Sequence, residues 1–425
     1  MMLPLVKSRD EISERLERRR SLAVEEFVTV EQIIAEVRSK GDEAVRELTL
    51  RYDKISVSEP KVSRRQLNKA EDALDSALRA ATQEAIENIR RFHESQVLSG
   101  IDLAQADGTR ISLAWRPLTR AGVYIPGGRF PLLSTVLMNV IPAQVAGVRE
   151  IAVCSPPGPD GMPDETVQGV CSLLDIHEVY SIGGAQAIAA MAYGTDTIPP
   201  VDKITGPGNI YVSVAKHVVS SAVGIDMLAG PTELAIVADK TANPDYVAAD
   251  LISQAEHDPH AWPILMTDST TLIDAVKEAL PNLLDNLPTR GIAESSLKDH
   301  GFVYLAESIE NCVAAANMIA PEHLSLQVLN PNRWVTKVTA GAIFLGPLTP
   351  VAWGDYWAGA NHILPTLGQA RFRGPLSVLD FLVPYSVVEA DSNTIKDSGD
   401  KVTRLAETEG LAGHALSVHL RRSDA

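Results

Sequence analysis

Residues 178–190 of this chain read EVYSIGGAQAIAA, a short apolar run that reaches a glycine pair and continues in small residues suited to a helix. Three other segments have a similar form, in which an apolar run ends in glycine or proline: AGVYIPGG at 121–128, REIAVCSPP at 149–157 and VDKITGPGN at 201–209. Strands of a parallel sheet are buried on both faces and read as continuous apolar runs. These segments therefore predict a parallel sheet with helices between its strands.

A second series of apolar runs follows, with amphipathic stretches between them. It comprises ELAIVAD at 233–239, WPILMTD at 262–268, GFVYLAE at 301–307 and GAIFLG at 341–346. We therefore predict an α/β protein built from two open units, followed by a helical tail from about residue 377.

The first 90 residues read as helices. Thr29 and Gln32 match a capping box that would begin one helix, and Gly41 would end it. At 425 residues the chain has room for about two or three domains, and its 45% hydrophobic residues are enough for real cores.

Charge and cysteine usage exclude several classes of protein. The formal net charge is −16, and the one basic cluster, RLERRR at 15–20, reads as a solvated helix face, so nucleic acid is not expected as a partner. The three cysteines lie far apart and predict neither a disulfide framework nor a thiolate metal site. No stretch resembles a secretion signal or reaches the roughly 18 apolar residues of a membrane span, so we expect a cytoplasmic protein.

A helix with its own start signal leads into the segment DLISQAEHDPHAW at 250–262. Asn243 is a suitable N-cap with Pro244 at the first helical position, and Pro259 would end the helix. The spacing of Val247 and Gln254 continues one apolar stripe, so the amide of Gln254 is expected to be buried.

His257 follows Gln254 by three residues and would therefore lie beside it. A carbonyl oxygen and an imidazole that converge in this way suit a metal with mixed ligands, most commonly zinc. On these residues alone, a capped helix end with hydrogen-bonded polar side chains is the simpler interpretation.

Glu322 and His323 are consecutive in APEHLSL. Adjacent side chains project differently, so an imidazole that moves protons and a carboxylate that activates water could serve separate steps. A polar loop without chemistry is the alternative.

Asp355 and His362 fall in WGDYWAGANHILPT, where the glycines and Asn361 predict an irregular loop. Both side chains are suitable zinc ligands or proton carriers. Asp in a glycine-rich loop is also a common turn former.

Glu409 and His414 lie in AETEGLAGHALSVHLRR. Five helical residues would turn their side chains about 140° apart, so they cannot share a face of one unbroken helix. Either the chain bends at Gly410 or Gly413, or the two residues serve different parts of a site.

The glycine-rich strand ends could present backbone N–H groups to a pyrophosphate. Because the G-x-G-x-x-G fingerprint is absent, this feature indicates NAD binding only weakly.

Taken together, these segments resemble the histidinol dehydrogenase family from about residue 25 to the C-terminus. The resemblance implies a zinc-dependent, NAD-linked four-electron oxidation of L-histidinol through histidinal to L-histidine, and a homodimer in which the tail of one subunit reaches the other's active site. The shared blocks are YIPGG, GGAQAIAA, GPGN, GIDMLAGP, SQAEH, PEHL, GDY with NHILPT, and EGLAGH.

The resemblance also implies a division into two incomplete Rossmann-like domains. Residues 1–25 would form an N-terminal helical arm, residues 26–123 with 233–376 the domain that carries the metal and catalytic residues, residues 124–232 the NAD domain, and residues 377–425 the helical tail.

Individual roles follow from the same resemblance. His323 would take the proton from the substrate alcohol, and Glu322 would help water attack the aldehyde. The zinc ligands would be Gln254, His257, Asp355 and His414, the last from the partner subunit. The substrate contacts would be Thr232, His362 and Glu409 together with the zinc ligands and His323, and the NAD contacts Tyr124, Gln186 and Asn209.

Two positions depart from the family pattern. Thr232 replaces the usual serine of AGPSE, and Asp258 replaces the glycine that usually follows SQAEH, which puts the fine fit of the substrate in doubt. A related dehydrogenase that oxidises a sulfopropanediol shares AGPT and is the main alternative, although Glu409 suits a cationic imidazole better than a sulfonate. A zinc hydrolase without a nucleotide and an inactive scaffold are more distant alternatives.

Overall fold

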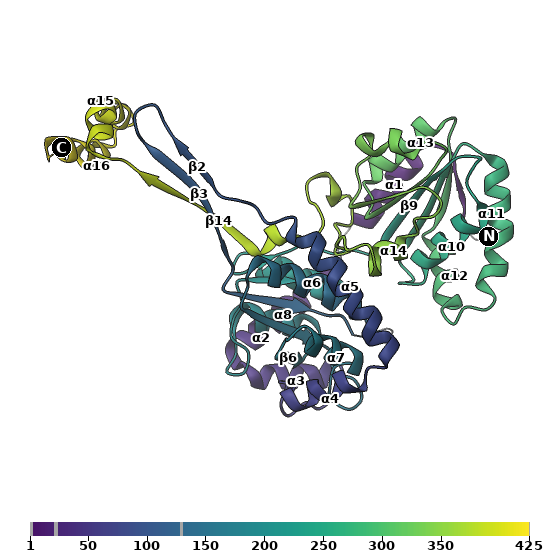
Figure 1. Cartoon of the computed structure of the whole chain (residues 1–425). Helices are drawn as coiled ribbons and strands as arrows, with labels where there is room; N and C mark the ends of the chain where they lie inside the picture. The colour runs from purple at the N-terminus through teal and green to yellow at the C-terminus, as the bar shows by residue number, and fades with distance from the viewer. Residues whose placement is uncertain (1–2, 21–23, 128–130, 425) are drawn as a thin grey trace.

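The computed structural model describes residues 3–20, 24–127 and 131–424. Two lobes, each a parallel sheet covered by helices, lie side by side, and a long ribbon projects from one of them to a helical hairpin at the C-terminus (Figure 1). The predicted α/β class with parallel sheets and helical ends is therefore confirmed.

The first lobe contains a six-stranded sheet in which every pairing is parallel. Helices α10, α11 and α12 bury one of its faces, and α1 and α13 bury the other. The strands in spatial order are β1 (Leu5–Val6), β11 (Phe302–Leu305), β10 (Trp262–Thr267), β9 (Glu233–Ala238), β12 (His323–Gln327) and β13 (Ala342–Leu345). The helices are α1 (Arg9–Arg20), α10 (Pro244–Ala255), α11 (Thr270–Leu284), α12 (Arg290–Asp299) and α13 (Ile309–Ile319).

The second lobe contains a five-stranded parallel sheet between two helical layers. Its strands in spatial order are β6 (Glu178–Ser181), β5 (Glu150–Ser155), β4 (Arg120–Tyr124), β7 (Lys203–Thr205) and β8 (Gly224–Ile225). One layer consists of α2 (Val24–Lys40), α3 (Asp42–Tyr52), α8 (Gly184–Tyr193) and α9 (Ile210–Val219). The other consists of α4 (Arg64–Ala73), α5 (Ser76–Glu94), α6 (Leu133–Ala146) and α7 (Glu165–Leu173).

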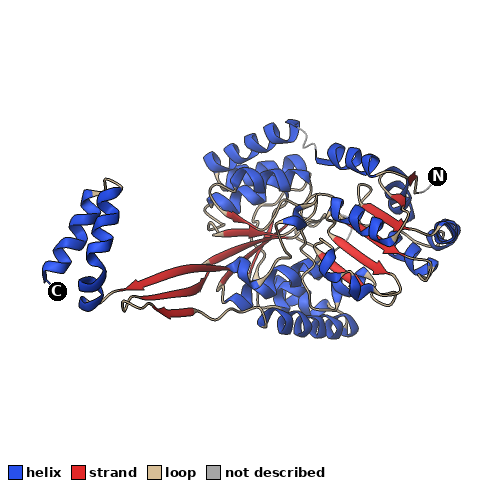
Figure 2. Ribbon diagram, turned by 90° about the horizontal axis from the view of Figure 1, so that it is seen from above, coloured by secondary structure: helices blue, strands red, loops and turns tan. Residues whose placement is uncertain are grey.

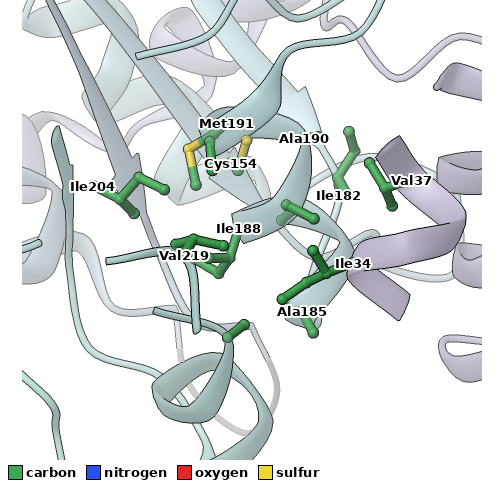
Figure 3. Packing of buried hydrophobic residues seen from close by; sticks show 14 of the residues in the cluster. Ile34, Val37, Cys154, Ile182, Ala185, Ile188, Ala190, Met191, Ile204 and Val219 are labelled. Carbon is green, nitrogen blue, oxygen red and sulfur yellow. The ribbon is translucent and has the colours of Figure 1, made fainter. Parts of the chain in front are cut away.

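The N-terminal helices belong to lobes other than those we expected. Residues 26–123 were expected to join residues 233–376, but α2 to α5 instead pack on the second lobe. Figure 3 shows the cause, because Ile34 and Val37 of α2 lie against Ile182 and Ala185 in one apolar cluster. The segment expected to be a helical arm, residues 1–25, contributes strand β1 and helix α1 to the first lobe.

Two local predictions in this region have different outcomes. Helix α2 ends at Lys40, directly before Gly41, as predicted. The predicted start at Thr29 is wrong, since α2 already begins at Val24 and Thr29 lies inside it. Buried Val30, Ile33, Ile34 and Val37 give this helix a packed face that does not depend on a cap at Thr29.

The projecting ribbon is an antiparallel three-stranded sheet that carries the C-terminal hairpin at its tip (Figure 2). Its strands are β2 (Ile101–Ala104), β3 (Arg110–Pro117) and β14 (Leu382–Glu389), and the hairpin consists of α15 (Ser392–Thr408) and α16 (Ala412–Asp424). The expected helical tail of residues 377–425 is thus corrected, because residues 382–389 pair with β3 along their whole length.

Short elements complete the chain. They are α14 (Val351–Tyr356) and the 3-10 helices η1 (Pro331–Arg333), η2 (Val335–Lys337), η3 (Gln369–Arg371) and η4 (Val378–Phe381). Across the described ranges, every helix is too short or too polar to cross a membrane.

Candidate active site

The first group of predicted site residues gathers at the amino edge of the first lobe's sheet. Strand β9 begins at Glu233 and the neighbouring β12 at His323, with His323 opposite Leu234. Helix α10 returns from the carboxyl end of β9 to the amino end of β10, so its last residues reach the same edge. Ligands of open α/β sheets usually bind at the carboxyl edge, and this lobe has its polar cluster at the opposite one.

Helix α10 begins as predicted and ends earlier than predicted. Asn243 Oδ1 accepts a 2.9 Å hydrogen bond from the Asp245 N–H, which confirms the cap. The helix ends at Ala255 and not at Pro259, so His257 lies in the following turn and is exposed. Gln254 is buried as predicted, and its Nε2 donates to Thr232 Oγ1 at 2.7 Å.

Glu322 is held in a buried hydrogen-bonded position. Its Oε2 accepts from the Thr232 hydroxyl and, at 2.9 Å, from the backbone N–H of Glu233. Burial raises the pKa of Glu322 to about 6, and these two hydrogen bonds act in the opposite direction. Such a carboxyl can exchange protons near neutral pH, as a general acid or base requires.

His323 presents one ring nitrogen with its lone pair free. Its Nδ1 lies 3.1 Å from the backbone oxygen of Glu233, and a carbonyl can only accept, so Nδ1 carries the hydrogen. Nε2 is then unprotonated, and it is buried without a hydrogen-bond partner, 3.9 Å from Asp355 Oδ1. Burial lowers the pKa of His323, which favours the neutral ring. A neutral imidazole with a bare Nε2 is a suitable proton acceptor.

Asp355 and His362 lie close together. Asp355 is in the last turn of α14, which corrects the expected irregular loop at this residue, whereas His362 lies in the irregular segment after that helix. His362 Nδ1 is 3.1 Å from the Asp355 carbonyl and 3.8 Å from Oδ1. Burial raises the pKa of Asp355 to about 6, and burial and the nearby His323 lower that of His362 to about 4.

The side chains around His323 include oxygen and imidazole donors of the kinds that metal sites use. Within residues 3–20, 24–127 and 131–424, no three His, Cys, Asp or Glu side chains are grouped so that they could hold a metal ion. The first lobe supplies Asp355, His257 and the amide of Gln254. Oxygen and imidazole ligands of this kind suit zinc, and the unpartnered Nε2 of His323 shows that the cluster is polar but not internally satisfied.

Glu409 and His414 are not part of this cluster within one chain. Helix α15 ends at Thr408, the chain turns at Gly410 with φ of 77°, and α16 begins at Ala412. Of the two alternatives left open, the structure therefore has the bend, and it lies at Gly410. Both side chains are exposed and line a groove between the two helices, at the tip of the ribbon far from the first lobe (Figure 1).

The three expected nucleotide contacts lie in the second lobe, at the carboxyl edge of its sheet. Tyr124 ends β4, and Asn209 follows β7 as the N-cap of α9, where its Oδ1 accepts from Val212 at 3.1 Å. The Tyr124 hydroxyl accepts from the Gly184 N–H at 3.1 Å, at the start of the helix that carries Gln186. Strand order reverses between β4 and β7, which is where such sheets bind nucleotides.

Comparison with known proteins shows the family to which this chain belongs. The profile that describes histidinol dehydrogenase matches residues 16–422. The chain belongs to the histidinol dehydrogenase family. It is 45% identical to histidinol dehydrogenase of Bacillus subtilis over 96% of this chain and 97% of that one, and 45% identical to that of Parasynechococcus marenigrum over 96% and 94%. The crystal structure of histidinol dehydrogenase from Elizabethkingia anophelis superposes with a TM-score of 0.94 at 35% identity, covering 99% of this chain and 98% of that chain.

For a histidinol dehydrogenase, both sequence departures are accommodated locally. Thr232 keeps a hydroxyl that donates to Glu322 and accepts from Gln254. Asp258 replaces glycine in the turn after His257. Its carboxylate accepts a hydrogen bond from the His260 N–H at 2.8 Å, and its backbone carbonyl accepts one from the Ala261 N–H at 2.9 Å. Neither residue has a positive φ, so neither replacement strains the backbone.

Glu233 also belongs to this buried cluster and was not predicted from the sequence. Its side chain is completely buried. Its backbone N–H and carbonyl bond to Glu322 and His323, and its carboxylate accepts a third hydrogen bond, from the Glu322 N–H. Burial raises its pKa to about 7, and the nearby Arg19 acts in the opposite direction. One feature of the sequence could have indicated this residue. A glutamate stands at the first position of the apolar run ELAIVA, and in the structure all six residues of that strand are buried.

Proposed function

We propose that this protein oxidises L-histidinol through L-histidinal to L-histidine, using zinc and two NAD, in the final steps of histidine biosynthesis in the cytoplasm. The observation that carries the proposal is the pairing of a bare imidazole nitrogen on His323 with the buried carboxyl of Glu322, beside zinc-type donors.

Proton transfer is assigned to the chain's own side chains. His323 Nε2 takes the alcohol proton, because Nδ1 is already engaged with the Glu233 carbonyl. Glu322 accepts a proton from the water that attacks the aldehyde, since its raised pKa keeps both protonation states accessible near neutral pH. Thr232 orients this carboxylate through its hydroxyl.

Zinc would be held by Gln254, His257, Asp355 and the partner subunit's His414. Because the amide nitrogen of Gln254 donates to Thr232, its oxygen is the atom assigned to the metal. Zinc has no redox chemistry of its own and would position and polarise the substrate. His362, with its ring beside Asp355, is assigned to the substrate, and Glu409 of the partner subunit to its cationic imidazole.

NAD is assigned to the carboxyl edge of the second lobe, in contact with Tyr124, Gln186 and Asn209. The Gly184 N–H at the start of α8 donates to the Tyr124 hydroxyl, so the next N–H groups of that helix are the ones assigned to the pyrophosphate. The two lobes would thus bring the nicotinamide and the alcohol together between them.

The reaction is tested by its stoichiometry. Purified zinc-loaded protein receives limiting L-histidinol and excess NAD, and sulfopropanediol is assayed in parallel. Two NADH per histidinol with histidine as product support the proposal. Turnover of sulfopropanediol alone would make the protein a related dehydrogenase, and zinc-dependent ester cleavage without NAD turnover would make it a hydrolase.

The shared site of a homodimer is tested by mixing two inactive variants. His323→Asn disables the site in the body of its own chain, and His414→Asn disables the tail that serves the partner. If subunits exchange randomly at equal amounts, half of the dimers are mixed and each has one intact site, so about 25% of wild-type activity should return. No recovery, with exchange shown by mass spectrometry of tagged subunits, would refute a site completed by the partner.

A further inference from the structure

We infer that Arg19 and Glu233 are positioning residues that hold the catalytic pair, Glu322 and His323, in place. Arg19 and Glu233 lie where three segments that link the two lobes meet. This inference rests on the proposed roles of Glu322 and His323. Neither Arg19 nor Glu233 is assigned to the substrate, the metal or the nucleotide.

Glu233 bonds to both members of the pair. The Glu233 N–H donates to Glu322 Oε2 at 2.9 Å, and in return the Glu322 N–H donates to Glu233 Oε2 at 3.2 Å. The Glu233 carbonyl accepts from His323 Nδ1 at 3.1 Å and thereby selects the tautomer with a bare Nε2. A small displacement of Glu233 would therefore change the position of both catalytic side chains.

Arg19 supplies the positive charge for this buried region. Two carboxylates at neighbouring strand starts repel each other in a medium that screens charge poorly, so one of them needs a cation nearby. Arg19 Nη1 lies 3.5 Å from Glu233 Oε1, and the Arg19 side chain is only 10% exposed. Its guanidinium also donates to the Pro231 carbonyl at 2.5 Å and lies 4.3 Å from the centroid of the Trp262 ring. One hydrogen bond, the aromatic ring and the ion pair thus hold the guanidinium, although Nη1 itself is buried without a hydrogen-bond partner.

The same contacts join three separate links between the lobes. Arg19 is at the end of α1 in the first lobe, and the next helix, α2, packs on the second. Pro231 lies between β8 of the second lobe and β9 of the first. Leu367, in the segment that returns from β13 to the ribbon, donates its N–H to Glu233 Oε1 at 3.1 Å. The spacing of the lobes, and hence of nucleotide and substrate, is in this way tied to the catalytic pair.

The test compares Arg19→Met with Arg15→Met. Arg15 lies on the same helix and packs over an aromatic ring of the same lobe, with its guanidinium 5.2 Å from the Phe302 centroid, but it has no contact with Glu233. Both variants should lower the unfolding temperature slightly. We expect Arg19→Met to lower kcat about 10- to 100-fold, because displacements near 1 Å have effects of this size. KM for histidinol and for NAD, and zinc content, should stay within about twofold of wild type.

Further variants show whether Arg19 acts through Glu233. Arg19→Lys keeps the charge and should recover most of the lost kcat. Glu233→Gln should lower kcat similarly, since an amide cannot accept from both Leu367 and Glu322. The double variant Arg19→Met with Glu233→Gln should be no slower than the slower single variant, because residues of one network are not additive.

Three results would overturn the inference. They are a kcat of Arg19→Met within twofold of Arg15→Met, independent multiplication of the two effects in the double variant, and a kcat that follows the unfolding temperature across all variants. Glu322→Gln and His323→Asn are assayed in parallel. If Glu322→Gln and His323→Asn stay fully active, the proposed function fails and the inference fails with it. If these two variants lose activity but the Arg19 and Glu233 variants do not, only the inference fails.

Discussion

Replacing Gly341 with alanine should slow catalysis without removing any functional side chain. Gly341 directly precedes β13, and its N–H donates to the Pro321 carbonyl at 2.9 Å. A Cβ atom at this position would lie 2.7 Å from the backbone oxygen of Glu322. Leu364 Cβ and Pro365 Cδ would each be 3.3 Å away, so the new methyl group has little space in which to move.

The expected size follows from these distances. The gap to the Glu322 oxygen must widen by about 0.3 Å to reach 3.0 Å and by about 0.7 Å to reach ordinary contact at 3.4 Å. That oxygen also accepts from the Ala342 N–H at 2.9 Å, so the strand starts cannot separate freely. Catalytic groups tolerate errors of about 0.5 Å, and 1 Å can cost about 100-fold. We therefore expect kcat to fall about tenfold, with about 1–3 kcal/mol lost from stability.

Gly346, at the other end of the same strand, provides the control. It has a φ of +79° and no atom within 4 Å of an added Cβ, so Gly346→Ala strains the backbone by about 1–2 kcal/mol without crowding the site. Steady-state kinetics and denaturant unfolding of both variants separate the two effects. Equal loss of kcat in both variants, or a kcat of Gly341→Ala within twofold of wild type, would refute the reasoning.

Three other perturbations have expected outcomes. Gly206→Ala should raise KM for NAD about tenfold with a smaller effect on kcat, because Gly206 has a φ of +110° and an added Cβ would overlap the Tyr124 backbone oxygen. Kinetics at varied NAD concentration check this prediction, and an unchanged KM for NAD would contradict it. Burial raises the pKa of Asp250 to about 6. Between pH 4 and 6 the folded state therefore keeps a proton on Asp250 that the unfolded state has already lost. The free energy of unfolding consequently falls as the pH rises through that window. Asp250→Asn has no carboxyl to titrate at this position. Between pH 4 and 7 its free energy of unfolding, measured with denaturant, should therefore rise by up to about 3 kcal/mol relative to that of the wild type. A strong chelator should abolish NADH formation and zinc should restore it, and full activity at an undetectable metal content would exclude the metal role.

Short-range patterns predicted the strands and one helix start well. The glycine-bounded apolar runs became the strands of two parallel sheets, and Asn243 caps α10 as its side chain allows. These features are determined by residues close together in the chain, so local sequence patterns are enough to predict them. The strand that begins at His323 was not predicted, because APEHLSL was singled out only for the chemistry of Glu322 and His323, with a polar loop as the alternative. The segment is a strand because neighbouring strands from elsewhere in the chain bury it.

Features that depend on distant partners were harder to predict. The ribbon strand Leu382–Glu389 was expected to be helical, and its pairing with β3 joins residues far apart in the chain. The lobe to which α2 belongs follows from packing against α8, which no local pattern indicates. Glu233 looked like an ordinary strand residue, and only the fold places it against both Glu322 and His323.

The pairing of β14 with β3 also constrains the order of folding. Leu382 pairs with Pro117 and Glu389 with Arg110, so this sheet cannot close until the ribosome has made nearly the whole chain. Closing so long a loop is slow compared with local helix and sheet formation. Both lobes can therefore mature before the C-terminal hairpin is presented, and a chain that stops before β14 could complete its lobes without ever forming the ribbon and the hairpin.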